Sequence, residues 1–312
     1  MSNPDDADGP PPEPIGLDEV ETYLCCPRRY QYAHRQEIGT RTTQDAIDAR
    51  TERYRDIITS TLAAHSGAAV TTDVLRETAR TQQRRPNAAA ADSRSRAAGS
   101  HRRYDRASVR NAIATYVDEY GQAHAEGAIA IDETYRYTTG GYSFACPVDC
   151  CWVEDGSYEI ARFVTTLDGI VWANPYSDPV ADYRDGEGFY PRQVGSILRA
   201  YATIHAVATA HELNPHNVSY RYYAIAEETH PSYEADGRAG PEVVSASRDV
   251  TETCWEADAA CPGLLTEVAA GLTADDGWSA TGDRWAEIVA TSCRHCSYQS
   301  MCLDYINEEV QF

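Results

Sequence analysis

Three cysteines near the C-terminus have the spacing of a metal site. Cys293, Cys296 and Cys302 form a C-x2-C-x5-C motif in which polar side chains separate the thiols. At the other end of the chain, the adjacent residues Cys25 and Cys26 stand directly before a proline. Four thiolates are a ligand set typical of zinc or of an iron–sulfur cluster. We therefore predict one metal centre that joins the two ends of the chain.

The separation of these ligands favours an iron–sulfur cluster. Zinc ribbons usually supply two close C-x2-C pairs, whereas here one distant cysteine complements a compact group of three. Cys26 is the preferred distant ligand because it immediately precedes Pro27, which can open a helix as its first residue; Cys25 is the alternate. The predicted cofactor is a 4Fe–4S cluster, with zinc as the alternative. The predicted ligands are Cys26, Cys293, Cys296 and Cys302.

The other cysteines have a plainer interpretation. The chain has 10 cysteines, and it lacks the basic start and apolar stretch of a secretion signal, which argues against a disulfide framework. Cysteine in an apolar context behaves as a small hydrophobic residue. We expect this role for Cys146, Cys150, Cys151, Cys254 and Cys261.

The elements that must bring the two ends together have helical and strand periodicity in a mixed order. Apolar spacing predicts helices over 17–24, 27–34, 43–64, 107–124, 193–211 and 264–272, and a last helix that begins in the cysteine motif. Alternation and turn residues predict strands over 129–137, 142–153, 158–164, 218–225 and 243–249. This order fits an α/β (α+β) fold, with a central mixed sheet flanked by helices. We expect one domain over residues 17–312.

Two segments differ from this core in composition. Residues 1–16 are rich in Pro, Asp and Gly and predict a disordered tail. Residues 76–106 are rich in arginine and alanine and predict an insertion, either a solvated linker or an arm that contacts phosphates. The arginines that we select as candidate DNA contacts in this insertion are Arg84, Arg85, Arg102 and Arg103.

The overall negative charge indicates the habitat of the protein and says little about its binding partner. The formal net charge is -21, and all 27 basic residues are arginine, because the chain contains no lysine. An acidic surface of this kind is typical of halophilic proteins and does not exclude nucleic acid as a partner. No stretch approaches the roughly 18 apolar residues of a membrane span, so we expect a soluble, cytoplasmic protein without a membrane partner.

The cysteine motifs, together with Tyr23-Leu-Cys-Cys-Pro-Arg-Arg-Tyr30, resemble those of the iron–sulfur RecB-like nucleases. These belong to the PD-(D/E)XK superfamily and include AddB-like nuclease domains and CRISPR-associated exonucleases. The resemblance covers residues 17–312 and implies a restriction-endonuclease-like core. It also implies that the cluster is a structural staple of the two ends of the domain, without a redox role.

The same resemblance exposes a departure at the nuclease centre. Asp149 matches the family's aspartate on the return strand of the hairpin, and Tyr201 matches the tyrosine of a downstream Gln-x3-Tyr motif. The Asp/Glu-x-Lys motif, however, is replaced by Arg162-Phe-Val164. An arginine thus stands where a carboxylate would hold a divalent ion, and no lysine exists to orient water. The resemblance therefore implies a vestigial or weak site at Asp149.

These observations leave three hypotheses. The leading one is a catalytically degenerate family member that binds DNA, either single strands or ends, or that acts as a scaffold for a helicase or nuclease partner in repair, recombination or CRISPR-type machinery. The second is an active nuclease, dependent on Mg²⁺ or Mn²⁺, whose site is rebuilt from Asp149, Glu159 or Glu133. The third is a zinc-stabilised interaction protein. The third hypothesis has no role for nucleic acid; in the first two, Tyr201 is a weak candidate DNA contact.

Overall fold

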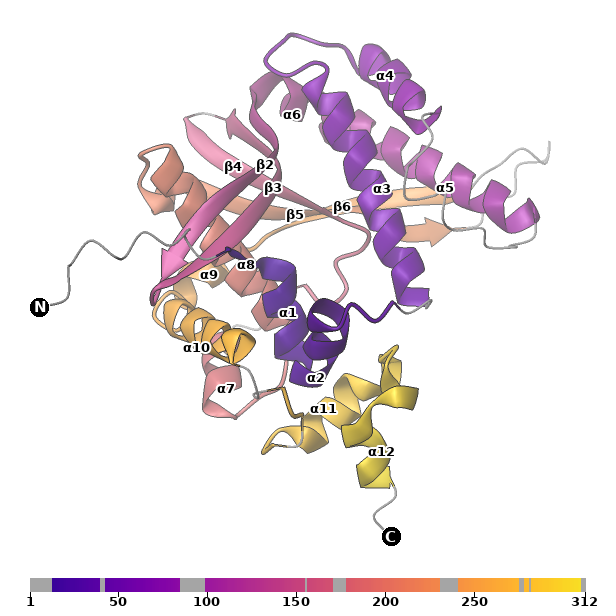
Figure 1. Ribbon diagram of the computed structural model, residues 1–312. Coiled ribbons are helices and arrows are strands. Elements are labelled where there is room, and N and C mark those ends of the chain that lie inside the picture. Colours follow the sequence, from indigo (N-terminus) through magenta and orange to yellow (C-terminus); the bar gives the residue numbers. More distant parts are fainter. Residues whose placement is uncertain are drawn as a thin grey trace, which may run out of the picture.

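The computed structural model confirms a mixed α/β fold in which a curled mixed sheet is flanked by helices (Figure 1). The structure describes residues 13–39, 43–84, 99–154, 156–170, 178–230, 241–274, 278–280 and 282–309. No described helix combines the length and the apolar character needed to cross a membrane.

The sheet is built on a long hairpin. Strands β2 (Ala128–Thr139) and β3 (Tyr142–Glu154) are antiparallel and are joined by a turn in which Gly140 and Gly141 both have positive φ. This backbone region favours glycine because a Cβ atom would be crowded there. β3 then pairs antiparallel with β4 (Ser157–Val164), which confirms the predicted order of the three strands.

The rest of the sheet adds a parallel and an antiparallel neighbour. β4 pairs parallel with β5 (Val218–His230), and β5 pairs antiparallel with the edge strand β6 (Glu242–Asp249). The same edge of β3 pairs with two strands in turn. Its first residues pair with the short strand β1 (Ile15–Gly16), and its last residues pair with β4. Asp149 lies between these two paired stretches of β3.

Helices cover both faces of the sheet. One face packs on α1 (Leu17–Cys25), α8 (Pro191–Ala210), α9 (Thr251–Glu256) and α10 (Cys261–Thr273). The other face packs on α3 (Thr43–Ala63), α4 (Thr72–Arg84), α5 (Gly99–Tyr116) and α6 (Gln122–Gly127). α7 (Pro179–Asp185) lies against α8.

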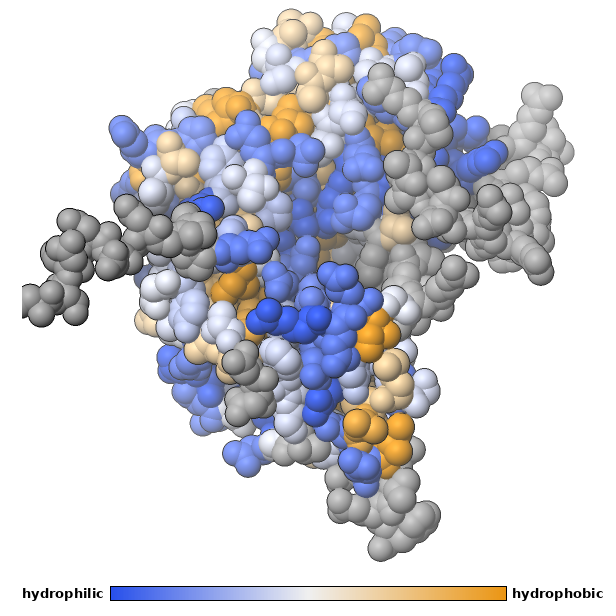
Figure 2. All heavy atoms as spheres, viewed as in Figure 1, coloured by the Kyte–Doolittle hydropathy of each residue, from blue (hydrophilic) through white to orange (hydrophobic). Residues whose placement is uncertain are grey.

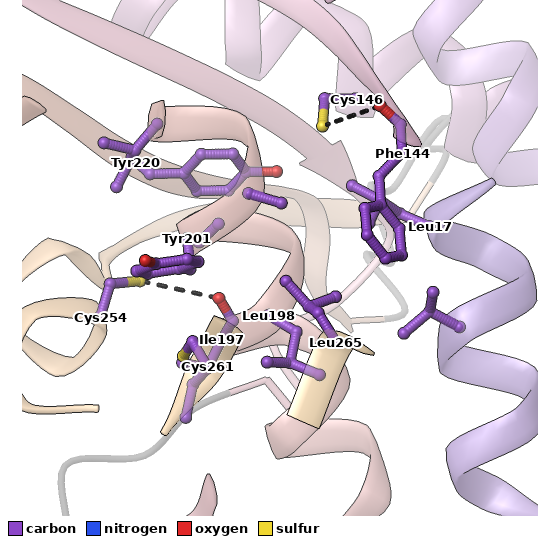
Figure 3. Close-up of a cluster of buried hydrophobic side chains, with 14 of the residues drawn as sticks. Leu17, Phe144, Cys146, Ile197, Leu198, Tyr201, Tyr220, Cys254, Cys261 and Leu265 are labelled. Atoms are coloured by element: carbon purple, nitrogen blue, oxygen red, sulfur yellow. Dashed lines mark hydrogen bonds between the residues drawn. The ribbon is translucent and has the colours of Figure 1, made fainter. Parts of the chain in front are cut away.

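The core on the α8 face shows the plain role of the internal cysteines. Cys254 donates its thiol proton to the carbonyl oxygen of Ile197, at 3.8 Å, and Cys261 lies close by beneath α8 (Figure 3). The predicted burial is confirmed for all five of these cysteines: Cys146, Cys150, Cys151, Cys254 and Cys261.

The C-terminal segment packs beside the start of the chain. α2 (Pro27–Tyr30) continues through a π-helical turn over Gln31–Arg35. Next to it lie α11 (Trp285–Thr291), 3-10 turns over Cys293–His295 and Gln299–Met301, and α12 (Leu303–Glu309), as Figure 1 shows. The C-terminal segment therefore packs against α2, below the sheet in Figure 1.

Two predicted boundaries are corrected. The predicted tail ends too late, because Ile15 and Gly16 form β1, and residues 1–12 lie outside the described part. The predicted insertion is too wide at its start, since residues 76–84 belong to α4, which buries Leu75 and Ala79. Its end overlaps α5, and residues 85–98 lie outside the described ranges.

Candidate functional site

Asp149 is held in a buried network of hydrogen bonds. Its side chain is on β3 and is 5% exposed. Arg162 of β4 donates from Nη1 to one carboxylate oxygen at 2.9 Å, and the backbone N–H of Phe163 donates to the other at 2.6 Å. The regular pairing of β3 with β4 ends at Cys150 opposite Ala161. The backbone N–H of Phe163 lies beyond this pairing, and the Asp149 carboxylate is its hydrogen-bond acceptor.

A second arginine completes this centre from α3. Arg55 donates from Nε to the carbonyl oxygen of Phe163 at 2.9 Å, and the same nitrogen lies 3.4 Å from the Asp149 carboxylate. Asp149 thus faces two guanidinium groups from its own chain. Coulomb attraction between opposite charges at such distances is strong when the groups are buried. The two guanidinium groups therefore balance the negative charge of the Asp149 carboxylate.

The two glutamates considered as replacement metal ligands lie elsewhere. Glu159 accepts hydrogen bonds from Arg221 at 2.9 Å and from the Tyr223 hydroxyl at 2.8 Å, on the other face of the sheet from Arg162. Glu133 is exposed on β2, where it accepts a hydrogen bond from Tyr135. Neither glutamate shares a hydrogen-bond partner with Asp149 among the described contacts.

The remaining candidate DNA contacts are dispersed. Tyr201 is 4% exposed and packs edge-on against Tyr137 in the core, so burial withdraws it from any surface that could contact DNA (Figure 3). Arg84 is exposed at the end of α4. Arg85 lies outside the described residues, and the side chains of Arg102 and Arg103 lie outside them as well.

A cleft of about 580 Å³ opens beside the Asp149 centre, between α1 and α3. Hydrophilic residues dominate this area of the surface in Figure 2. The acids that line it are Asp18, Glu21, Glu52 and Asp168. Its arginines are Arg29, Arg55, Arg162, Arg192 and Arg199. This concentration of arginine stands out in a chain of net charge -21.

Helix α8 supplies two of these arginines, Arg192 and Arg199, and Arg199 is deeply buried. Its side chain is 3% exposed and donates from Nε to Glu21 at 2.6 Å and from Nη2 to Asp18. The guanidinium of Arg199 lowers the pKa of Asp18 to about 2, although the Asp18 side chain is largely exposed. Nη1 of Arg199 is buried without a hydrogen-bond partner in the described structure.

Sequence reasoning missed Arg55 and Arg199. Both sit in helices whose periodicity marks a buried face, and arginine is rarely buried unless it is paired. An arginine placed among apolar helix positions was therefore the signal that could have found them. Their acidic partners are distant in sequence, and no spacing rule connects them.

The four predicted metal ligands do come together. Cys26, Cys293, Cys296 and Cys302 line one small cavity of about 10 Å³ between α2 and the 3-10 turns. Cys26 lies at the N-cap position of α2, directly before Pro27. Cys25, by contrast, lines the neighbouring cleft. The predicted preference for Cys26 therefore agrees with the placement of the two side chains.

We call Cys26, Cys293, Cys296 and Cys302, with the segments that carry them, the cysteine joint. None of these four cysteines forms a disulfide. Burial, together with the neighbouring thiols, raises the pKa of Cys26 to about 12 and that of Cys293 to about 11. Among the described residues, no group of three or more His, Cys, Asp or Glu side chains has the arrangement of a metal-ion site. The four thiols have the donor chemistry of a thiolate-bound metal group and share one cavity. The described side chains, however, are not arranged around a single ion.

Other contacts join the same two ends of the chain. Arg28 donates two hydrogen bonds, both at 3.0 Å, to the Asp304 carboxylate at the start of α12. The Tyr298 hydroxyl donates to the carbonyl oxygen of Ile38 at 3.1 Å, and its ring packs on Tyr32. The cysteine joint is therefore also supported by an ion pair and by aromatic packing.

Comparisons of this chain with protein-family models, with curated proteins and with solved structures find no match.

Proposed function

We propose that this protein is a non-cutting, DNA-binding member of the RecB-like branch of the PD-(D/E)XK superfamily. In this proposal it acts as a scaffold in repair, recombination or CRISPR-type machinery, with a helicase or nuclease as its protein partner. Single strands or strand ends are the proposed form of DNA. The Arg162–Asp149 ion pair is the observation that carries the proposal.

This ion pair opposes hydrolysis for an electrostatic reason. Metal-assisted phosphodiester hydrolysis needs carboxylates that converge on a divalent ion. Here the Asp149 carboxylate is engaged by Arg162, by Arg55 and by the Phe163 amide. A divalent ion would have to displace two guanidinium groups from a buried site, and their positive charge would repel it.

The arginines of the neighbouring cleft support binding of nucleic acid, in particular Arg29 and Arg192, which form no ion pair among the described contacts. The cleft between α1 and α3 places cationic side chains beside the position where a nuclease of this type would hold its substrate. Guanidinium groups bind phosphate with paired hydrogen bonds and suit contacts with a nucleic-acid backbone. Such binding needs no metal at Asp149.

The four cysteines of the joint would hold a 4Fe–4S cluster in this proposal. The cluster would supply a covalent link between α2 and the C-terminal turns. A specific observation keeps zinc, and with it an interaction protein stabilised by zinc, as a second candidate. A cavity of about 10 Å³ holds one water-sized group, so a cluster requires the thiols to lie farther apart.

Cleavage and binding assays on the same samples test the main proposal. We expect wild-type protein to bind labelled single-stranded and double-stranded DNA and to leave both intact with Mg²⁺ or Mn²⁺. Asp149→Asn, which retains an acceptor for the Phe163 amide, should bind as wild type does. Metal-dependent cleavage that disappears in Asp149→Asn would establish the active nuclease instead.

Metal analysis of protein purified without oxygen distinguishes the two cofactors. We expect iron and sulfide in comparable amounts and visible absorption that is lost in Cys26→Ala. One zinc per chain without iron, together with no DNA binding, would favour the interaction protein stabilised by zinc.

A further inference from the structure

A second pocket adjoins the arginine-lined cleft at the start of α8. It has a volume of about 300 Å³ and shares Arg29, Arg192 and Ser297 with the cleft. Its other polar side chains include Tyr190, Gln193 and Ser292. The lining contains no aspartate or glutamate among the described residues, although the chain has 48 acids. We call it the α8 pocket.

Two guanidinium groups face this pocket from different elements. Arg29 comes from α2 and Arg192 from the first turn of α8. Among the described contacts, neither forms an ion pair with a carboxylate, whereas Arg55, Arg162 and Arg199 of the neighbouring cleft all do. The α8 pocket therefore carries two positive charges that the described carboxylates do not neutralise.

The backbone of α8 adds donors at the same place. This helix of 20 residues begins with Pro191 after Tyr190, and no side chain caps its first turn. The amides of Arg192 and Gln193 come before the first internal hydrogen bond of the helix, from Val194 to Tyr190. Helix N-termini carry partial positive charge and favour anions.

The positive character continues into the cleft along one face of α8. Arg192, Ser196 and Arg199 have helical spacing and all line the cleft. Arg199, which lines the cleft and not the α8 pocket itself, is almost fully buried, and its Nη1 atom has no hydrogen-bond partner in the described structure. Buried donors are normally satisfied, so an unpaired guanidinium nitrogen points to an acceptor supplied by a ligand or by water.

We infer that the α8 pocket binds a phosphate monoester, carried either by the end of a nucleic-acid strand or by a free nucleotide. A monoester has a charge near -2 at neutral pH, which matches two unpaired arginines, whereas a phosphodiester has a charge of only -1. The volume is in the range of pockets that hold small ligands. This inference deepens the proposed function, on which its nucleic-acid form rests.

The segments that carry the four cysteines also contribute to the wall of this pocket. Arg29 lines both the cysteine cavity and the α8 pocket, and Thr291, Ser292 and Ser297 reach the pocket from the segment that contains Cys293 and Cys296. The pocket wall is therefore built from both ends of the chain. A metal group at the cysteines would fix the phosphate site as well as the fold.

Competition binding with matched oligonucleotides tests the inference. The probe is a fluorescent single strand, and the competitors carry a 5′-phosphate, a 3′-phosphate or only hydroxyl ends; a nucleoside monophosphate is titrated separately. Assays begin at the lowest salt that preserves the circular dichroism spectrum, since salt weakens phosphate contacts. We expect one phosphorylated end to compete about tenfold better than the hydroxyl ends.

Variants locate the effect. Arg29→Gln and Arg192→Gln should each remove the preference for the phosphorylated end, whereas Arg136→Gln, which changes an exposed arginine on β2 outside both cavities, should retain it. Thermal unfolding verifies that each variant is folded. A preference that survives in the Arg29→Gln, Arg192→Gln double variant overturns the assignment of the pocket.

The outcomes also separate this inference from the proposed function. Equal binding of phosphorylated and hydroxyl strands overturns the monoester pocket and leaves DNA binding intact. Binding of the monophosphate alone, lost in the arginine variants, supports the pocket and removes the DNA proposal. Failure of every phosphorylated ligand to bind overturns both.

Discussion

Two centres of this molecule hold acidic groups in opposite ways. At the Asp149 centre the chain supplies its own cations, because Arg162 and Arg55 surround the carboxylate. At the cysteine joint, four thiols line one cavity, and burial raises the pKa values of Cys26 and Cys293. The first centre has more guanidinium groups than carboxylates, whereas at the second the four thiols outnumber the two arginines, Arg28 and Arg29, that line their cavity.

The contrast shows how one chain can close one acidic centre to a metal ion and leave another accessible to one. A side-chain cation that pairs with a buried carboxylate excludes a metal ion from it, and Arg162 is paired with Asp149 in this way. No described arginine donates a hydrogen bond to a thiol at the cysteine joint, where Arg28 instead pairs with Asp304. The joint therefore remains chemically open to a metal, while the carboxylate centre is closed to one.

Removing a thiol from the joint should have the largest effect. A metal link between Cys26 and Cys293 would close a loop of about 270 residues, and the chain-entropy relation for such a cross-link gives an upper value of about 5.6 kcal/mol. We expect Cys26→Ala to lose the metal and to lower the free energy of unfolding by up to this amount. Denaturant unfolding and metal analysis measure both quantities.

The adjacent thiol provides the matched control. Cys25→Ala, which lines the cleft and not the cysteine cavity, should retain the metal and lose much less stability. A larger loss in Cys25→Ala than in Cys26→Ala would make Cys25 the ligand. Equal metal content in both variants and wild type would remove the metal from the comparison.

Breaking the Asp149 centre should have the next largest effect. Arg162→Ala leaves a buried carboxylate without its main partner, and such losses cost about 3–5 kcal/mol. The control is Arg221→Ala, which breaks the Arg221–Glu159 pair on the other face of the same sheet. Because Arg221 is partly exposed, its loss should cost about 1 kcal/mol.

Denaturant unfolding of both variants gives the result. Similar losses in the two variants would mean that the Asp149 centre is not specially dependent on its arginine. A variant Arg162→Ala that is stabilised by Mg²⁺, as judged by a thermal shift absent from wild type, would further sharpen the comparison. It would show that the arginine alone closes the site to a metal.

The elements that depend on local periodicity could be predicted from the sequence. The β2–β3 hairpin follows from alternation around Gly140 and Gly141, and α8 follows from a long helical apolar pattern. The shared cavity of Cys26 and the C-terminal cysteines was also predictable, because thiol clusters have few other uses. The identity of the metal stays a prediction.

The contacts that are long-range in sequence could not be predicted. The Arg199 partners on α1 are about 180 residues away, and nothing in either segment specifies the other. Residues 76–84 have the composition of an insertion, but Leu75 and Ala79 pack α4 on the core. Composition describes the exposed side of such a helix and conceals the few apolar residues that fix it.

The smallest expected effect concerns Asp18, at the exposed edge of the arginine network. Arg199 lowers the pKa of Asp18 to about 2, so the unfolded chain takes up a proton at this group more readily than the folded chain does. The resulting stabilisation is present above pH 4 and is lost as the pH falls toward 2. Because the side chain is 71% exposed, solvent screening should limit its contribution to under about 1 kcal/mol.

The free energies of unfolding of wild type and Asp18→Asn, measured between pH 5 and pH 2, should therefore converge at the acid end. Asp73→Asn, which removes an exposed partner of Arg76 on α4, is the control for surface charge. A gap between wild type and Asp18→Asn that stays constant down to pH 2 would mean that Asp18 acts by packing, and that the arginine network ends at Glu21.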